Sequence, residues 1–366
     1  MKQILFIRYR RPEKIDVGGE QCTNANYTVL CELYGEENIT VYYIHDSSNK
    51  KNFLLNILSI LYYLLKGFYY GLSTKKINEI IFIAKKHNYV FIDRSLFGVI
   101  AKKLTEQDYQ GKIITFFHNV ETIYFAAKIK KHLPWRNIVV KCADKNDRQA
   151  CAYSDVIIAL NKRDEKEIEK RYNRCVDIIT PIVFQDSYKL PVYDEKQMIN
   201  SIPVCLFVGT YFPMNVNGIL WFIKEVLPYI NIRLQIVGKG MNAILPQIKE
   251  NLPVEVFSDV PDLKDFIEQA DFMLFPIFDG SGMKVKTCEA LMYGKNIIGT
   301  TEAFEGYDLN SNKVGACCNS KEDFIQVFNE ISKLPRSRFN TYSRGIFVEN
   351  YSIEQRKRKF AEIFSK

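Results

Sequence analysis

The sequence lacks the patterns that define secreted disulfide-bonded proteins and zinc-binding proteins. Its nine cysteines include no Cys-x-x-Cys pair, and no cluster of Cys and His has the spacing of a zinc site. The first apolar run, Ile4–Ile7, is too short for the core of a secretory signal and leads into Arg8, Arg10 and Arg11. We therefore expect a cytoplasmic protein with reduced thiols and no secretory signal.

The segment that most resembles a membrane span is too short to be one. Residues 52–65 carry no charge but fall short of the ~20 apolar residues that a spanning helix needs. Lysines flank or interrupt the wider segment 50–76 and tyrosines lie within it, at Lys50, Lys51, Lys66, Lys75, Lys76, Tyr62, Tyr63, Tyr69 and Tyr70. Both residue types favour the headgroup level of a membrane. We predict that residues 50–76 contact an anionic membrane surface, with a core helix as the alternative.

The basic residues are unevenly distributed in a chain of otherwise ordinary globular composition. Apolar residues make up 47% and charged residues 25% of the sequence, which excludes wholesale disorder. The formal net charge is +8; residues 1–183 carry 29 Lys and Arg against 20 Asp and Glu, and residues 184–366 carry 21 against 22. A basic half fits nucleic acid or a membrane surface. No nucleic-acid-binding module is recognisable, so we expect the membrane and no nucleic acid.

Short apolar runs alternate with helical patterns along the chain. In the first half the expected strands are Ile4–Arg8, Ile39–His45, Tyr89–Asp93, Lys112–Phe117 and Asp155–Leu160, and the expected helices are Gln21–Leu33, Phe53–Leu72, Leu96–Leu104 and Lys162–Tyr172. In the second half the expected strands are Val204–Val208, Arg233–Val237, Val254–Phe257, Asp271–Phe275 and Asn296–Gly299, and the expected helices are Asn215–Leu227, Asp262–Gln269, Lys284–Tyr293, Glu322–Ser332 and Ser352–Ser365. This alternation predicts βαβ units and parallel sheets.

The sequence therefore predicts an α/β protein with two Rossmann-like, doubly wound domains. We expect the first domain over residues 1–184, a proline-containing linker over 185–203, the second domain over 204–350 and a last helix over 351–366. Ligands of such sheets bind beyond the carboxyl ends of the strands. A cleft between two facing domains is thus the expected site. The basic block Arg356–Lys359 on the last helix is expected to be a solvated face.

The segment 271–294 combines the end of a strand, a glycine-containing turn and the start of a helix. It reads DFMLFPIFDGSGMKVKTCEALMYG, with Gly280 and Gly282 in the turn and the helix beginning near Met283. Free N–H groups and the positive end of the helix dipole favour a phosphate group at such a junction.

Three charged residues follow this turn in the expected helix. Lys284 and Lys286 add positive charge beside the turn, and the carboxylate of Glu289 is suited to accept hydrogen bonds from ribose hydroxyls. The alternative is a plain strand–turn–helix joint with solvated lysines and a surface glutamate. The combination of turn, paired lysines and glutamate favours a nucleotide site.

Six segments of the sequence, spread over both halves, resemble those of one enzyme family. They are residues 279–307, which include DGSGMKVKTCEALMYG and KNIIGTTEAFEGY, together with VG…PMNVNGILWFIKEVLP (208–228), LQIVGKG (234–240), FSDVPDLKDF (257–266), FHNVETIY (117–124) and SDVIIALNKR (154–163). Together they resemble GT-B-fold, family-4-like glycosyltransferases, which build bacterial polysaccharides. The resemblance implies that the first domain binds the acceptor, the second binds the nucleotide sugar, and the last helix returns to the first domain.

The resemblance also implies roles for residues of the second domain. Glu289 would hold the ribose hydroxyls, Lys286 and Lys284 would neutralise the diphosphate, and Gly282 and Met283 would offer backbone N–H groups to it. The donor is expected to be linked to uridine or guanosine diphosphate.

Further donor contacts are implied at positions along the same domain. Val260 would meet the nucleobase, and Gly209 and Gly238 end two strands near the donor. Ser281 stands where many retaining relatives have a second glutamate, and Asp279 is the nearest carboxylate. This departure leaves the contacts to the transferred sugar, and the stereochemical outcome, open.

In the first domain the resemblance points to a loop and a histidine. Gly18 and Gly19 would form a glycine-rich loop that closes over the diphosphate or the acceptor. His118 would contact the sugar and act with Lys286 in catalysis, although a structural histidine is the alternative. If the enzyme inverts configuration, His118, Asp16 and Glu20 are candidate bases; if it retains configuration, the leaving phosphate itself accepts the proton.

The expected function is a glycosyltransferase that moves a sugar from a nucleotide-diphosphate sugar to a glycan or lipid-linked acceptor. We expect retention of configuration, a place at the cytoplasmic membrane face, and a role in bacterial surface polysaccharide or glycoconjugate synthesis. Lysines and the helix start can stabilise the leaving diphosphate, and the sequence has no clear Asp-x-Asp motif, so no metal or other cofactor is expected. The alternatives are a catalytically silent partner of another transferase, or a nucleotide-sugar epimerase of the same fold, for which the four histidines are few.

Overall fold

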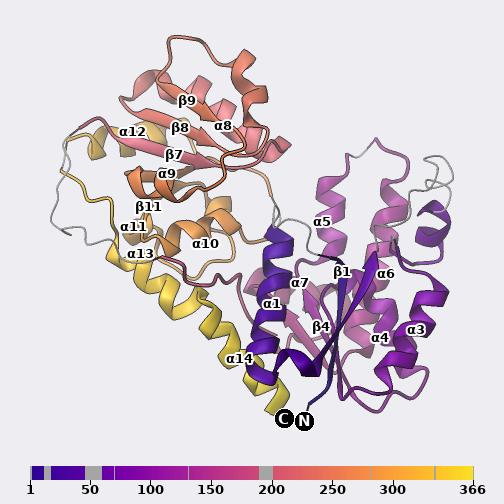
Figure 1. Cartoon of the computed structure of the whole chain (residues 1–366). Coiled ribbons are helices and arrows are strands. Elements are labelled where there is room, and N and C mark those ends of the chain that lie inside the picture. The colour runs from indigo at the N-terminus through magenta and orange to yellow at the C-terminus, as the bar shows by residue number, and fades with distance from the viewer. Residues whose placement is uncertain are drawn as a thin grey trace. The chain divides into compact units, whose positions relative to one another are not determined.

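A computed structural model describes residues 2–11, 18–45, 60–69, 71–130, 132–188, 201–280, 282–333 and 335–365. The chain divides into two compact units (Figure 1). Unit 1 comprises Met1–Val183 and Ile353–Lys366, and unit 2 comprises Phe184–Ser352. Each unit contains a six-stranded sheet whose strands all pair in parallel, which confirms the prediction of two doubly wound α/β domains.

Unit 1 has the strand order β2-β1-β3-β4-β5-β6. Its strands are β1 (Ile4–Arg10), β2 (Ile39–His45), β3 (Tyr89–Ile92), β4 (Lys112–Phe117), β5 (Val156–Ala159) and β6 (Ile178–Ile179). Its longer helices are α1 (Gly18–Tyr34), α3 (Thr74–Ala84), α4 (Gly98–Thr105), α5 (Glu121–Lys128), α6 (Arg136–Tyr153), α7 (Lys162–Tyr172) and α14 (Ile353–Ser365). The residues Ile4–Ile7 of β1 are fully buried, as expected for a strand that helices cover on both faces.

Unit 2 has the strand order β12-β11-β10-β7-β8-β9. Its strands are β7 (Val204–Val208), β8 (Arg233–Val237), β9 (Val254–Phe257), β10 (Phe272–Phe275), β11 (Asn296–Gly299) and β12 (Gly315–Cys317). Its α-helices are α8 (Pro213–Glu225), α9 (Lys264–Gln269), α10 (Val285–Met292), α11 (Ser311–Val314), α12 (Lys321–Ile331) and α13 (Thr341–Ile346). Phe222, Phe324 and Phe328 pack edge to face in the core between α8 and α12.

Two sequence predictions about the first half are wrong in their boundaries. The helix α1 begins at Gly18 rather than at residue 21, so Gly18 and Gly19 belong to its first turn and do not form a loop. The helix expected over residues 53–72 ends at Leu65 in its described part, where a turn with Gly67 at φ +81° follows. Residues 53–59 of that prediction, and Lys50, Lys51 and Tyr70, lie outside the described residues.

Three helices of unit 1, α3, α5 and α6, are absent from the prediction. The sequence of α6 is strongly polar, yet Asn146 and Asp147 within it are completely buried. These side chains are buried because they bond to neighbouring elements: Asn146 accepts a hydrogen bond from the backbone of Val99, and Asp147 accepts one from the hydroxyl of Ser95. A pattern of apolar residues alone therefore does not reveal this helix.

The stretch between the two sheets is partly described. Residues 189–200 of the predicted linker lie outside the described residues. The residues just before them pack within unit 2: an Arg344 Nη2 lies 2.5 Å from Asp186 Oδ2, and the ring of Tyr188 lies 5.1 Å from that of Tyr293. Unit 2 thus begins at Phe184, where its backbone N–H donates to the carbonyl of Tyr351.

The last helix, α14, runs along α1 within unit 1 (Figure 1). The prediction that its basic block is a solvated face is wrong at Arg356, which is completely buried. Its guanidinium lies 5.3 Å from the ring centre of Phe116 and donates to the carbonyl of Pro181 and to the side chain of Asn26. A charge can be buried at this position because polar groups of unit 1 surround it.

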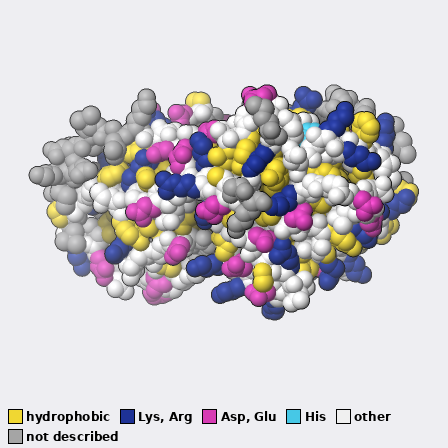
Figure 2. Space-filling model, turned by 90° about the horizontal axis from the view of Figure 1, so that it is seen from below, with side chains coloured by type: hydrophobic (Ala, Val, Ile, Leu, Met, Phe, Trp, Pro, Cys, Tyr) yellow, Lys and Arg dark blue, Asp and Glu magenta, His cyan; other side chains and the backbone are white. Residues whose placement is uncertain are grey.

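Charged side chains of both signs are interspersed on the face drawn in Figure 2. Lys and Arg side chains lie there among Asp and Glu side chains. The basic excess of the sequence is therefore not gathered into one patch among the described side chains of that face. In the described ranges, no helix combines the length and apolar character needed to cross a membrane.

Candidate functional site

The carboxyl ends of β7 and β10 form the topological switch point of unit 2. These neighbouring strands are parallel, and the chain proceeds from β7 toward one edge of the sheet and from β10 toward the other. Ligands of doubly wound sheets bind beyond the strand ends at such a point. Gly209 follows β7, and the predicted donor segment follows β10, so the fold brings both to the switch point.

The turn after β10 leads into α10. Gly282 has a φ of +75°, a left-handed conformation that suits glycine. The helix has no side-chain cap at its start, so its first N–H groups are suited to bind an anion. In this turn Met283 is buried and Asp279 is exposed, whereas Ser281 lies outside the described residues.

Lys284 is fixed in the turn rather than mobile. Its ammonium lies 2.6 Å from Glu302 Oε1 and donates to the carbonyl of Gly282 at 2.8 Å. The hydroxyl of Tyr307 donates to the backbone carbonyl of Lys284 at 2.6 Å. The lysine therefore anchors the turn that the predicted donor site uses.

Lys286 lies at the switch point between the two strands. Its ammonium donates to Asn215 Oδ1 of α8 at 2.8 Å and lies 4.7 Å from the ring centre of Phe207. Burial lowers the pKa of Lys286 to about 7, the charge of Lys284 acts in the same direction, and Glu289 opposes both. A lysine in this setting gains its proton when an anion binds next to it.

Glu289 lies one turn after Lys286 on α10. Burial raises the pKa of its carboxyl to about 7, Asp262 raises it further, and Lys286 opposes the rise. Its carboxylate has no hydrogen-bond partner among the described residues. A half-buried carboxylate without donors is suited to accept hydrogen bonds from hydroxyls of a ligand.

The remaining predicted donor residues lie at other strand ends of unit 2. A Cβ at Gly238 would collide with the carbonyl oxygen of Gly209, so the turns after β7 and β8 pack backbone to backbone. Val260 is half-buried in the turn between β9 and α9. The same turn contains Asp262, whose side chain accepts from the N–H of Lys264 at 2.9 Å.

In unit 1, His118 is buried at the end of β4 and bonds to Asp93 at the end of β3. The His118 Nε2 lies 3.2 Å from Asp93 Oδ2, and Asp93 also accepts from Thr23 at 2.5 Å and from Asn26 at 2.7 Å. Burial acts to lower the pKa of His118, but Asp93 and Cys22 outweigh it and raise the pKa to about 9. The raised pKa favours the protonated, hydrogen-bond-donating form of His118 at neutral pH.

The second candidate base, Glu20, is already paired. Its carboxylate lies 3.2 Å from an Arg8 nitrogen, 3.6 Å from Arg10 and 3.7 Å from Arg94. The third candidate, Asp16, lies outside the described residues. Of the predicted bases, His118 is thus paired with a negative charge and Glu20 with positive charges.

Sequence reasoning missed the polar residues that surround His118. Asp93 and Arg94 directly follow the apolar residues of β3, just as His118 follows β4, and this placement is the signal that could have found them. Glu121 begins α5 and is 1% exposed, with an Oε1 that has no partner. Burial raises the pKa of Glu121 to about 7, while Arg94 opposes the rise.

The buried arginine of α14 belongs to the same network. Arg356 donates to Asn26 Oδ1 at 2.9 Å, and Asn26 in turn donates to Asp93. The Arg356 guanidinium also lies 3.6 Å from the sulfur of Cys22. Burial acts to raise the pKa of the Cys22 thiol, but Arg356 and His118 outweigh it and lower the pKa.

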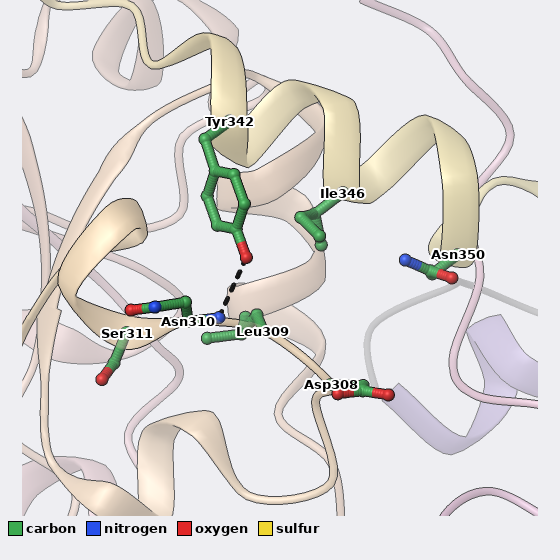
Figure 3. A pocket seen from close by; sticks show the side chains of 7 residues that line it. All are labelled: Asp308, Leu309, Asn310, Ser311, Tyr342, Ile346 and Asn350. Atoms are coloured by element: carbon green, nitrogen blue, oxygen red, sulfur yellow. Dashed lines mark hydrogen bonds between the residues drawn. The ribbon is translucent and has the colours of Figure 1, made fainter.

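Unit 2 also has an open hollow at another place. Figure 3 shows its lining, in which the N–H of Asn310 donates to the hydroxyl of Tyr342 at 3.0 Å. The hollow has a volume of about 650 Å³ and is lined by Asp308, Leu309, Asn310, Ser311, Tyr342, Ile346 and Asn350. None of the predicted donor-site residues lines it. Across the ranges that the structure describes, no group of three His, Cys, Asp or Glu side chains has the arrangement of a metal site.

The two doubly wound units define the fold class of the protein. Its structure resembles GT-B glycosyltransferases over its whole length. Sucrose-phosphate synthase of Thermosynechococcus elongatus matches with a TM-score of 0.70 and 12% identity, over 100% of this chain and 98% of that chain. Anabaena HepE in complex with UDP-glucose matches with a TM-score of 0.65 and 11% identity, over 100% of both chains.

The sequence comparisons are consistent with this class. Residues 202–334 match the family model described as group 1 glycosyl transferases. The chain is 23% identical over 321 residues to an uncharacterised 44.6 kDa protein in the cps region of Klebsiella pneumoniae, covering 80% of this chain and 77% of that protein. The protein therefore carries a group 1 glycosyltransferase domain on a GT-B fold and is an enzyme of the glycosyltransferase class.

Proposed function

We propose that this enzyme transfers a sugar from a nucleotide-diphosphate sugar to a glycan or lipid-linked acceptor. The observation that carries the proposal is the pair of Lys286 and Glu289 on α10, one turn apart and both buried enough to have shifted pKa values. One helix thus carries a cation that would bind the diphosphate and a carboxylate that would bind the ribose. The cps region of the Klebsiella relative supports a role in surface polysaccharide or glycoconjugate synthesis.

The nucleotide that fits best is a uridine diphosphate sugar. HepE, whose fold this chain shares, has been solved with UDP-glucose and with UDP. A GDP-linked donor is the competing possibility from the sequence. Among the groups that would meet the nucleotide, Val260 lies in the turn after β9.

The leaving diphosphate is stabilised by groups of the protein. When the sugar–phosphate bond breaks, negative charge develops on the phosphate oxygen. Lys286, which takes up its proton from solvent when the anionic donor binds, stabilises that charge, and the start of α10 offers N–H groups to the same oxygens. We infer that this positive charge makes a metal ion unnecessary.

The reaction is expected to retain the configuration of the sugar. Inversion needs a free side-chain base to deprotonate the acceptor hydroxyl. Both described candidates are paired with opposite charge, His118 with Asp93 and Glu20 with Arg8. The leaving phosphate is then the group that accepts the acceptor proton.

We also propose that unit 1 contacts the cytoplasmic face of the membrane through the segment 50–76. In its described part, Leu65 is 71% exposed, Tyr62 is 53% exposed, and the Lys66 ammonium lies 4.3 Å from the Tyr62 ring centre. An exposed apolar and aromatic group beside a lysine suits an anionic headgroup layer. Co-sedimentation with anionic vesicles should fall for Leu65→Asp, whereas the exposed control Phe82→Asp should bind like wild type. Wild-type protein that stays in the supernatant at low salt contradicts this proposal.

A donor screen tests the proposed transfer. The full chain is incubated with a panel of UDP- and GDP-linked sugars, and release of nucleoside diphosphate is measured. The proposal expects release from one donor or a small group of donors, with Lys286→Met inactive on the same donor. A panel without any release, together with a lack of binding to UDP and GDP, contradicts the proposed function.

A further inference from the structure

The switch point of unit 1 gathers four arginines. It lies between β1 and β3, because the chain goes from β1 to β2 on one side and from β3 to β6 on the other. Arg8, Arg10 and Arg11 lie at the end of β1, and Arg94 follows β3. This is the position at which a doubly wound sheet binds its ligand.

The guanidinium of Arg94 has no hydrogen-bond partner among the described residues. Its side chain is 20% exposed, and its nearest carboxylate oxygen, on Glu20, is 3.7 Å away, which is too far for a hydrogen bond. The Nε of Arg8, a residue only 3% exposed, also lacks a partner. A buried guanidinium donor without an acceptor is costly, so the unpaired Nε of Arg8 indicates a missing acceptor, whereas the guanidinium of Arg94 is partly exposed.

The acidic groups nearby do not balance the positive charge. Glu20, Asp93 and Glu121 face Arg94, and Asp93 is already shared with the cation His118. Against these three carboxylates stand Arg8, Arg10, Arg94 and His118, with the exposed Arg11 beyond them. Glu121, with its pKa raised to about 7, is only partly ionised at neutral pH. Among the residues that the structure describes, the site therefore has an excess of positive charge.

The absence of a side chain at Gly19 makes room for Arg94. A Cβ at position 19 would lie 2.9 Å from Arg94 Nη2, which is closer than such contacts occur. Glycine at the second position of α1 thus allows the guanidinium to lie over the start of the helix. Guanidinium groups bind phosphate and carboxylate groups with paired hydrogen bonds.

We propose that this switch point binds a negatively charged group of the acceptor, with Arg94 as the main contact and Arg10 and Arg8 beside it. The proposal rests on the proposed function and on the expectation that the first domain binds the acceptor, and it names the class of that acceptor. The group is a phosphate, as in a lipid-linked diphosphate, or the carboxylate of an acidic sugar. Arg10, whose side chain is 49% exposed, lies on the side that solvent reaches.

Calorimetric titration of the full chain tests the proposal. The protein is first saturated with UDP to fill the donor site and then titrated with inorganic pyrophosphate in one arm and glucuronate in the other. Wild type should bind one of the two probes at a second site. Binding should weaken about tenfold or more in Arg94→Gln, because hydrogen bonds to a charged group are lost.

Matched variants keep the test informative. Gly19→Ala keeps the charge but displaces Arg94, so it should weaken binding less than Arg94→Gln does. Arg148→Gln, an exposed arginine of α6 that pairs with Asp144, should bind the probe like wild type. If Arg94→Gln does not fold, Arg10→Gln provides a second measurement, because the side chain of Arg10 is half-exposed. Its binding of the probe should be reduced severalfold.

Three results overturn the proposal. UDP-saturated wild type that binds neither probe shows that no second anion site exists. Equal binding by Arg94→Gln, Arg10→Gln and wild type shows that the anion lies elsewhere. An Arg94→Gln variant that loses affinity for UDP itself assigns the arginine to the donor. Failure of the proposed function is distinguishable, because wild type then fails to bind UDP in the first step.

Discussion

The candidate sites of the two units are built in opposite ways. In unit 2 the central residues, Lys284, Lys286 and Glu289, lie within one turn and one helix, so their spacing is fixed by six residues of sequence. In unit 1 the cluster around His118 draws on β1, α1, β3, β4 and α14, and its arginine from α14 lies 330 residues from the Asn26 that it contacts. A local site shows in the sequence as a motif, whereas a site made by distant strand ends shows only after folding.

The largest effect is expected for Lys286→Met, which tests the local site of unit 2. We expect turnover of the donor to fall by about 10²–10³, the usual cost of removing a group that stabilises developing negative charge. The pKa of Lys286 is lowered to about 7, so its ammonium form is disfavoured in the folded protein, and below pH 10.5 the variant should unfold at a higher temperature than wild type. Nucleoside diphosphate release and thermal unfolding measure the two effects.

The matched control is Lys224→Met, an exposed lysine of α8 whose side chain is 83% exposed. It should leave both turnover and unfolding temperature unchanged. If Lys286→Met kept wild-type turnover, the local motif of unit 2 would not be the donor site. The comparison would then have no local site in unit 2.

The second prediction concerns the long-range network of unit 1. Arg356→Met removes the donor that serves Asn26 and the carbonyl of Pro181, and it should lower the free energy of unfolding by about 3 kcal/mol. Arg358→Met, an exposed arginine on the same helix, should cost less than about 0.5 kcal/mol. Denaturant unfolding of both variants checks this; equal stabilities would mean that α14 is held without Arg356.

A third test asks whether Asp93 controls His118. Asp93→Asn removes the charge that keeps the imidazolium stable, so burial prevails and the pKa of His118 should fall from about 9 to 6.5 or below. NMR titration of the ring protons is practical because the chain has only four histidines. His118→Gln identifies the resonance. A His118 pKa near 9 in Asp93→Asn would assign the shift to another group.

The smallest expected effect is a change in proton binding at the donor site. At pH 8 Lys286 is mostly neutral and Glu289 mostly ionised, because both pKa values are about 7. Binding of UDP at that pH should therefore take up somewhat less than one proton at Lys286. Calorimetry in two buffers of different ionisation enthalpy measures the uptake, and Lys286→Met should show none. Proton release by wild type at pH 8 is inconsistent with this role of the lysine.

The sequence predicted the framework well because hydrophobic runs and strand-end glycines are local signals. The strands β7, β8 and β9 have the expected bounds, and the turn before α10 contains Gly280 and Gly282, as expected. The polar helix α6 escaped prediction because its buried Asn146 and Asp147 are stabilised by partners from other elements. The prediction for Arg356 is wrong for the same reason, because no residue near it in the sequence indicates that its side chain is buried.

The protonation of the site residues was also beyond the sequence. A lysine and a glutamate four residues or fewer apart are ordinary on a helix surface. Their shifted pKa values come from burial beside Phe207 and from the charges of Lys284 and Asp262, which meet only in the folded unit. His118, named from its segment, acquires its charge from Asp93 on another strand.

The central claim is that the nucleotide binds at the switch point of unit 2. Hydrogen–deuterium exchange of the full chain with and without UDP tests it most directly. The account predicts slower exchange over residues 280–292, where the turn and α10 bind the diphosphate and ribose, and no such change in Lys286→Met. Protection confined to unit 1, or equal protection of residues 280–292 in Lys286→Met, would contradict it.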